Sequence, residues 1–383
     1  MFKDKLWTAL LRHPATGWMN PGDAALPELR PGARLLWCGT GGALLAAAAL
    51  VRACGDEAAQ GHWLALDSSE ALPVALRPSD QVVFASRTGK TLETWTWIGR
   101  LRSLPGWDAL EQPPLVITRD DGNPLAAWAR AEGWRLLPIP ADVGGRYAAF
   151  SPVGTLPLAW LGRDAQAFLQ GGRDVAQEAP QALGHWGARI WGMVETLHEG
   201  YLAGIQEWVL LPYCRRLEPL AAWWAQLLAE SLGKMARDGT RRGLTPIPAV
   251  GPMAQHALLQ RWMAGPRTLG VILLTVAGAG DPERLAVPEG CPYPALAGLQ
   301  GAQILQAQAE GTRETLEAAG VPVVHWELEA LSERTLGELM MAWQLIVALT
   351  GFALEVDPFG QPELADGQKR TLAKLGLPGT TIS

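Results

Sequence analysis

Short apolar runs alternate with helical patterns along the chain as far as Ile139. Apolar runs of four to six residues are typical of buried strands, and apolar positions that recur every three or four residues are typical of amphipathic helices. This alternation predicts a parallel sheet with helices on both of its faces. The expected strands are 34–38, 62–66, 81–85, 114–118 and 134–139, and the helices between them end near 53, 102 and 132.

The pattern starts again after a largely helical stretch at 164–203. We therefore expect an α/β protein with two consecutive open units, at residues 1–165 and 166–350, followed by a tail at 351–383 with a short final helix. In the second unit the expected strands are 208–212, 268–276 and 321–327, and the expected helices are 219–235, 253–264, 302–319 and 332–349.

Composition excludes several classes of protein. Apolar residues make up 48% of the 383 and charged residues 18%, which is incompatible with a disordered chain. The formal net charge of −6 provides no basic surplus for binding nucleic acid. The longest uninterrupted apolar run, 43–51, is too short to span a membrane. Four widely spaced cysteines, without metal-binding spacing, indicate reduced structural thiols and a cytoplasmic protein.

Two loops that follow expected strands are suited to bind an anion. Gly39-Thr40-Gly41-Gly42 would let backbone N–H groups approach a ligand, although such turns are also common as plain structure. Ser86-Arg87-Thr88-Gly89-Lys90-Thr91 places hydroxyls and two cations at a helix start, which is how a phosphate monoester can be held without a metal. The alternative for this second loop is an ordinary N-capping segment.

Three further segments contain candidate chemistry. Arg146 follows Gly144-Gly145, so its guanidinium could enter a cleft, or it could be a surface residue on a turn. Glu230 lies one helical turn after Gln226 on the same face, and its alternative is a solvated pair with Lys234. His256 begins a helix, where a lone histidine is usually structural.

Taken in order, these segments resemble the glucose-6-phosphate isomerase family over about Leu35 to Lys369. The most specific parts are Gly-Gly-Arg-Tyr at 144–147 and the pair Glu-Ser-Leu-Gly-Lys at 230–234 and Gln-His-Ala-Leu-Leu-Gln at 255–260. The resemblance implies two sugar-isomerase (SIS) domains, each built on a five-stranded parallel sheet. It also implies a homodimer with a sugar phosphate as substrate, and no nucleic-acid or membrane partner.

The resemblance implies catalytic roles for four residues. Glu230 matches the base that moves a proton between C1 and C2, and Arg146 matches the cation that stabilises the enediolate intermediate. His256 matches the histidine that opens the sugar ring and comes from the neighbouring subunit. Lys369 matches its lysine partner in the tail. The matching substrate-binding residues are Gly41, Gly42, Ser86, Arg87, Thr88, Thr91, Gln226 and Gln361.

The chain departs from the family pattern at several positions. Ala43 and Ala148 replace usual serines, Leu232 replaces a usual asparagine, and Arg87 stands at a usual lysine. The lysine of the tail usually follows the glutamine by seven residues, whereas Lys369 is one residue late, and Lys374 is a second candidate.

The residue set is complete for an aldose–ketose isomerase. A carboxylate can move the proton, a fixed cation can stabilise the enediolate, and neither a cofactor nor a metal is required. The alternatives are a bifunctional phosphoglucose/phosphomannose isomerase and a non-catalytic phosphosugar-binding protein. Gln361 disfavours the first, because members of that branch tend to have threonine at this place. The joint presence of Glu230, Arg146 and His256 disfavours the second.

Overall fold

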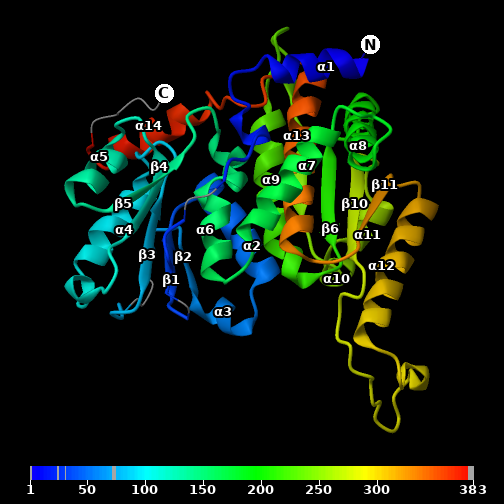
Figure 1. Ribbon diagram of the computed structural model, residues 1–383. Helices are drawn as coiled ribbons and strands as arrows, with labels where there is room; N and C mark the ends of the chain where they lie inside the picture. Colours follow the sequence, from blue (N-terminus) through cyan, green and yellow to red (C-terminus); the bar gives the residue numbers. More distant parts are fainter. Residues whose placement is uncertain (1, 24–25, 31, 71–74, 378–383) are drawn as a thin grey trace.

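The computed structural model describes residues 2–23, 26–30, 32–70 and 75–377 of the chain. In this part, two parallel sheets are flanked by helices on both faces (Figure 1), as the sequence predicted. The first sheet has the order β2-β1-β3-β4-β5, formed by Trp63–Leu66, Leu35–Cys38, Gln81–Ala85, Leu115–Arg119 and Arg135–Ile139. The second has the order β11-β10-β6-β9, formed by Val323–Leu328, Leu269–Val276, Glu207–Pro212 and Thr245–Pro248.

The α-helices agree with most of the expected spans and add several short ones. They are α1 (Phe2–Leu11), α2 (Leu45–Cys54), α3 (Glu57–His62), α4 (Leu92–Arg102), α5 (Pro124–Ala131), α6 (Pro152–Trp160), α7 (Ala165–Glu178), α8 (His185–Leu202), α9 (Glu218–Leu232), α10 (Met253–Ala257), α11 (Leu259–Ala264), α12 (Gly301–Ala318), α13 (Glu333–Ala353) and α14 (Leu364–Lys374). The helix expected over 253–264 is interrupted at Leu258, which separates α10 from α11.

The second sheet differs from the five-stranded sheet that the family resemblance implies. Among the described residues it has four strands. One of these, β9, was missed from the sequence because its Thr-Pro-Ile-Pro segment contains two prolines. Proline cannot donate to a strand ladder, and it is tolerated here because β9 is the edge strand. A small antiparallel pair, β7 (Lys234–Met235) with β8 (Arg241–Arg242), was also missed.

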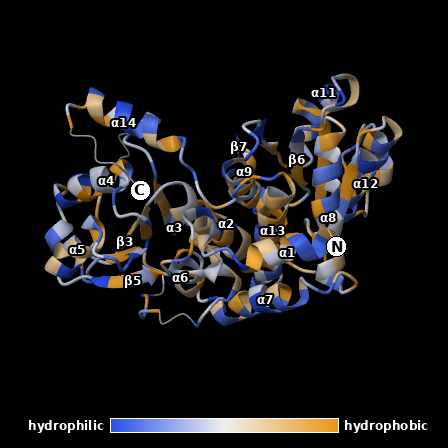
Figure 2. Cartoon of the chain, turned by 90° about the horizontal axis from the view of Figure 1, so that it is seen from above, coloured by the Kyte–Doolittle hydropathy of each residue, from blue (hydrophilic) through white to orange (hydrophobic). Residues whose placement is uncertain are grey.

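A central helical layer lies between the two sheets and joins them into one core. Alternate strand residues face opposite sides: Leu35 and Trp37 of β1 face this layer, whereas Leu36 and Cys38 face α4 and α5. The hydrophobic residues concentrate in the strands and central helices (Figure 2). The longest helix, α13, is apolar and long enough to cross a membrane by length and composition alone. However, 83% of its most apolar window is buried inside the protein, as in the core helix of a globular domain.

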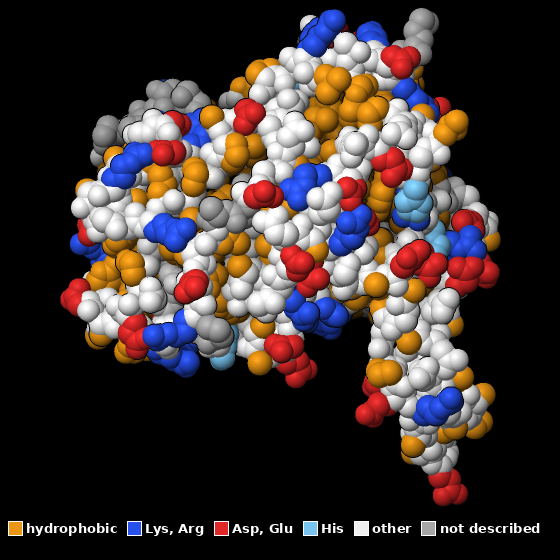
Figure 3. All heavy atoms as spheres, viewed as in Figure 1, with side chains coloured by type: hydrophobic (Ala, Val, Ile, Leu, Met, Phe, Trp, Pro, Cys, Tyr) orange, Lys and Arg blue, Asp and Glu red, His pale blue; other side chains and the backbone are white. Residues whose placement is uncertain are grey.

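Two segments extend away from this core. Residues 277–300, between β10 and α12, form an arm that projects from the body and exposes hydrophobic side chains (Figure 3), including Leu285 and Tyr293. Helix α14 lies at the edge of the molecule on the side of the first sheet, and none of its residues is buried (Figures 1 and 2).

Candidate functional site

The loops singled out in the first unit meet at one edge of the first sheet. Because the strands of this sheet are parallel, their carboxyl ends lie together, and ligands of such sheets bind there. Gly39–Gly42 follows β1, Ser86–Thr91 follows β3, and Gly144–Arg146 follows β5. The last turn of α9 reaches the same place, since Glu230 contacts Arg146.

Arg146 is the centre of this site. Its side chain is only 3% exposed, and the residue lies in a 3₁₀ helix at Gly145–Phe150. Nε donates to Ser231 Oγ at 2.8 Å, and Nη1 donates to Glu230 Oε2 at 3.3 Å and to Gln361 Oε1 at 2.7 Å. Nη2 donates to the backbone carbonyls of Pro358 at 2.6 Å and of Gly360 at 3.1 Å. The guanidinium is therefore buried, hydrogen-bonded and fixed in orientation.

Glu230 and Gln226 lie one turn apart in α9 and bind each other. Gln226 Nε2 donates to Glu230 Oε1 at 2.9 Å, while Arg146 binds the other carboxylate oxygen. The Glu230 side chain is 29% exposed, so a ligand can reach it. Gln226 Oε1 is buried without a hydrogen-bond partner among the described residues. A carboxylate held in one orientation beside a buried cation is an arrangement suited to proton transfer with stabilisation of developing negative charge.

Gly41 and Gly42 allow three parts of the chain to approach closely. Gly41 has a φ of +53°, and a Cβ there would lie 2.8 Å from Gln226 Nε2. A Cβ on Gly42 would lie 2.6 Å from the backbone nitrogen of Arg146. The glycines thus serve close packing at the site, in addition to any contact with a ligand through backbone N–H groups.

The Ser86–Thr91 loop turns tightly from β3 into α4. Ser86 Oγ and Thr91 Oγ1 are hydrogen-bonded at 2.7 Å, and Gly89 N–H donates to the Ser86 carbonyl at 3.1 Å. Gly89 has a φ of +66° and packs against Asn123, which caps α5. Thr88 and Thr91 are half-buried, whereas Ser86 is buried. The loop therefore presents hydroxyls at the start of a helix, as the sequence predicted.

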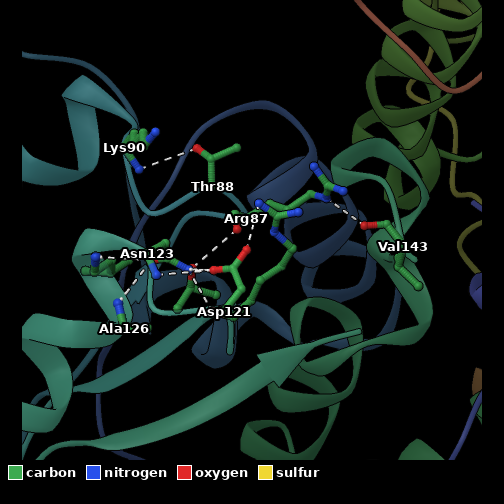
Figure 4. Close-up of polar contacts among 10 residues, drawn as sticks. Arg87, Thr88, Lys90, Asp121, Asn123, Ala126 and Val143 are labelled. Atoms are coloured by element: carbon green, nitrogen blue, oxygen red, sulfur yellow. Dashed lines mark hydrogen bonds and ion pairs between the residues drawn. The ribbon is translucent and has the colours of Figure 1, made fainter. Parts of the chain in front are cut away.

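Arg87 connects this loop to the Gly144–Arg146 segment. Its Nε donates to the Val143 carbonyl at 2.6 Å (Figure 4), and Thr88 and Lys90 lie on the turn beside it. Burial, then the charge of Arg119, and also that of Arg146, lower the pKa of the Arg87 guanidinium, while Asp121 opposes them. Several cations at one edge indicate a site for an anionic ligand.

Two residues of the Glu-Ser-Leu-Gly-Lys motif have contacts that sequence reasoning missed. Ser231 is fully buried and binds both Arg146 Nε and the hydroxyl of Tyr147, the latter at 3.2 Å. Lys234 does not form the solvated pair with Glu230 considered from the sequence. The helix ends at Leu232, and Lys234 Nζ donates to the Asp357 carbonyl instead. In the sequence, the only signal that Ser231 and Lys234 belong to the site was their position in the motif.

His256 and Lys369 are not part of this cluster. Both side chains are exposed, and neither forms a hydrogen bond or ion pair with a described residue. His256 lies on α10 on the outer face of the second sheet, and Lys369 lies on α14. The described residues also contain no group of three His, Cys, Asp or Glu placed to hold a metal ion.

Comparison with known proteins identifies the family of the chain. No family model matches the chain. It is 35% identical over 353 residues to a glucose-6-phosphate isomerase of Thermus thermophilus, and the match covers 88% of this chain and 82% of that protein.

Two solved structures are similar over nearly the whole chain. A hypothetical protein from Thermus thermophilus is 31% identical with a TM-score of 0.86, covering 97% of this chain and 94% of the other. A glucose-6-phosphate isomerase from Chlamydia trachomatis has a TM-score of 0.71 at 19% identity, covering 98% of this chain and 73% of the other, which shows the fold alone. From its sequence identity to relatives of similar length, the chain belongs to the glucose-6-phosphate isomerase family.

Proposed function

We propose that the protein is an aldose–ketose isomerase that interconverts glucose 6-phosphate and fructose 6-phosphate. The observation that supports this most directly is the contact between Glu230 and Arg146, in which a partly exposed carboxylate lies beside a buried, fixed cation. The related enzyme of Thermus thermophilus is named for this substrate.

Glu230 is the base of the reaction. It removes the proton from one of the two carbons C1 and C2 and returns it to the other, through a cis-enediolate. Gln226 binds one carboxylate oxygen and Arg146 binds the other, so the carboxylate is held in one orientation for proton transfer. The guanidinium of Arg146 stabilises the enediolate oxygens.

The phosphate of the sugar binds at the Ser86–Thr91 loop and Arg87. Hydroxyls at a helix start and a desolvated guanidinium both favour a phosphate. The backbone N–H groups of Gly41 and Gly42 contact the sugar. Binding energy from the phosphate, which is remote from the reacting carbons, orients C1 and C2 against Glu230.

The site is completed by a second subunit. His256 is exposed and makes no contact with the Glu230 cluster within the described chain, which agrees with a role in a partner's site. The projecting arm exposes 67% of Tyr293 and 37% of Leu285, apolar surface that a second copy would cover. We therefore propose a homodimer in which His256 opens the sugar ring in the neighbouring site, together with Lys369.

We also propose that the two units divide near residue 165 and that the protein is cytoplasmic. Strands β1–β5 lie within 1–165 and β6–β11 within 166–350, which supports a division there with a tail from 351. Four unpaired cysteines, three of them buried, agree with a cytoplasmic protein.

A coupled assay with fructose 6-phosphate and mannose 6-phosphate tests the function. The purified protein should convert fructose 6-phosphate to glucose 6-phosphate, with mannose 6-phosphate turned over far more slowly. Comparable turnover of mannose 6-phosphate would instead identify a bifunctional enzyme. Binding of fructose 6-phosphate without turnover would identify a phosphosugar-binding protein. The contact between Gln361 and Arg146 favours an isomerase specific for glucose 6-phosphate and fructose 6-phosphate. It uses the glutamine that distinguishes this branch from the bifunctional phosphoglucose/phosphomannose isomerases.

A further inference from the structure

Lys234 is a buried cation that the mechanism above does not use. It follows the C-terminal cap of α9 and opens β7, where it pairs with Arg242 of β8. The residue is only 9% exposed, and its ammonium donates to the carbonyl of Asp357. Burying an ammonium is costly unless the group is paired and hydrogen-bonded.

The segment that Lys234 binds is the one that holds Arg146. Residues 357–361, called the strap below, follow α13 and contribute three acceptors to the Arg146 guanidinium: the carbonyls of Pro358 and Gly360 and the side chain of Gln361. Lys234 binds the first residue of the strap, immediately before these acceptors. The bond therefore connects the end of α9, which contains Glu230, to the segment that orients its partner.

The other side of the strap is held by ring packing. The Phe359 ring lies 5.1 Å from that of Tyr147 and 4.5 Å from that of His13, centroid to centroid. Asp357 Oδ1 accepts from Phe359 N–H at 2.9 Å, which tightens the turn. Among the described residues, two cations, Lys234 and Arg146, donate to carbonyls of the strap from near the end of α9. Because Arg146 is the group that must be positioned, Lys234 is the one that can hold the strap for it.

We infer that Lys234 is a positioning residue for the isomerase reaction, which acts by holding the strap so that its acceptors fix Arg146 beside Glu230. This inference rests on the proposed function. A charged donor forms a hydrogen bond about twice as strong as a neutral one, so the protonated lysine is the form that holds the strap.

The charges around Lys234 set the pH at which this hold weakens. Burial, and then the charge of Arg146, lower the pKa of Lys234 to about 8, against the opposing charges of Asp357, Glu363 and Glu230. Arg242 lies opposite it across the β7–β8 pair. Above this pH the neutral amine holds the strap less firmly, and turnover should fall.

The test compares Lys234→Met with Lys234→Arg. Lys234→Met keeps the length of the side chain without its charge, and should lower kcat by about 10²-fold with KM within about twofold, as expected of a small misplacement of a reacting group. Lys3→Met, which removes an exposed lysine paired with Glu195, is the matched control and should leave both constants unchanged.

Lys234→Arg should restore most of kcat at pH 7. The wild-type enzyme should lose activity above about pH 8, and this decline should move to higher pH in Lys234→Arg, because arginine stays charged.

Hydrogen exchange provides a readout that does not depend on activity. The amides of the strap should exchange faster in folded Lys234→Met than in the wild-type protein, while those of α4 should not change. If Lys234→Met does not fold, the pH profile of Lys234→Arg decides. Wild-type kcat and wild-type strap exchange in Lys234→Met would overturn the inference, as would an unmoved alkaline decline in Lys234→Arg. An inactive wild-type protein would contradict the proposed function, and the exchange experiment would still decide whether Lys234 holds the strap.

Discussion

At the scale of single residues, the geometry of the site depends on the residues that pack against Arg146 and bind its guanidinium. Its guanidinium makes five hydrogen bonds to two segments, the end of α9 and the strap, and its backbone nitrogen lies against Gly42. Such a group is well oriented but has little freedom to move without losing its partners. Small changes in the glycine loop should therefore affect chemistry before they affect the fold as a whole.

Gly42→Ala tests this dependence. The new Cβ would lie 2.6 Å from Arg146 N and against the Gly145 backbone, so the segment that contains Arg146 must shift. We expect kcat to fall by about 10²-fold. Gly99→Ala in α4 has open space around its Cβ and should raise stability by up to about 1 kcal/mol without affecting kcat. Normal turnover by Gly42→Ala would mean that the position of Arg146 is less restricted than its contacts indicate.

At the scale of elements, the junction of β3 with α4 forms the proposed phosphate site. The buried Ser86 follows the strand, Gly89 packs against Asn123 in the turn, and the helix begins after Thr91. These contacts pre-form the loop, so little ordering entropy should be lost when an anion binds.

Replacing Thr88 and Thr91 together by alanine should raise KM for fructose 6-phosphate by at least about tenfold. A hydrogen bond to a charged group is worth about 1.5–3 kcal/mol, and both threonines are only half-buried. Thr96→Ala, which removes an α4 hydroxyl bonded to the Leu92 carbonyl, is the control and should leave KM unchanged. An unchanged KM in the double variant, measured by steady-state kinetics, would place the phosphate elsewhere.

At the scale of the whole molecule, the site joins segments that are far apart in sequence. Arg146 binds residues 85 and 215 positions away, and the central helical layer holds the two sheets on which these segments lie. The exposed positions of His256 and Lys369 leave the ring-opening groups outside this cluster. Full activity should therefore require two copies of the chain.

Mixed dimers test that requirement. Glu230→Gln and His256→Ala should each be nearly inactive, but when the two are mixed and allowed to exchange subunits, half of the dimers contain one intact site. About a quarter of wild-type activity should return, as expected for random pairing in a two-fold dimer. If exchange is demonstrated and activity stays at the level of the single variants, His256 does not act across an interface.

Some parts of this structure could be predicted from the sequence, and others could not. The strands of the first sheet were predictable, because apolar runs mark buried strands. The meeting of Arg146 with Glu230 was expected only from the family resemblance, because Glu230 lies in α9 and not in a loop after a strand. The bond from Lys234 to Asp357 was not, since it spans 123 residues and uses a backbone carbonyl that has no sequence signature. The edge strand β9 was hidden by its two prolines.

The central claim is that Glu230 moves the proton between C1 and C2, and isotope exchange in Glu230→Gln tests it most directly. The glutamine keeps the shape and hydrogen-bonding reach of the side chain but cannot accept the proton. In D₂O, wild-type enzyme should introduce deuterium at C2 of the glucose 6-phosphate formed from fructose 6-phosphate. Glu230→Gln should bind substrate almost normally while kcat and deuterium incorporation fall by about 10²–10⁴-fold. Glu195→Gln, an exposed glutamate on α8, should behave as wild type. Incorporation by Glu230→Gln at the wild-type rate would contradict the account.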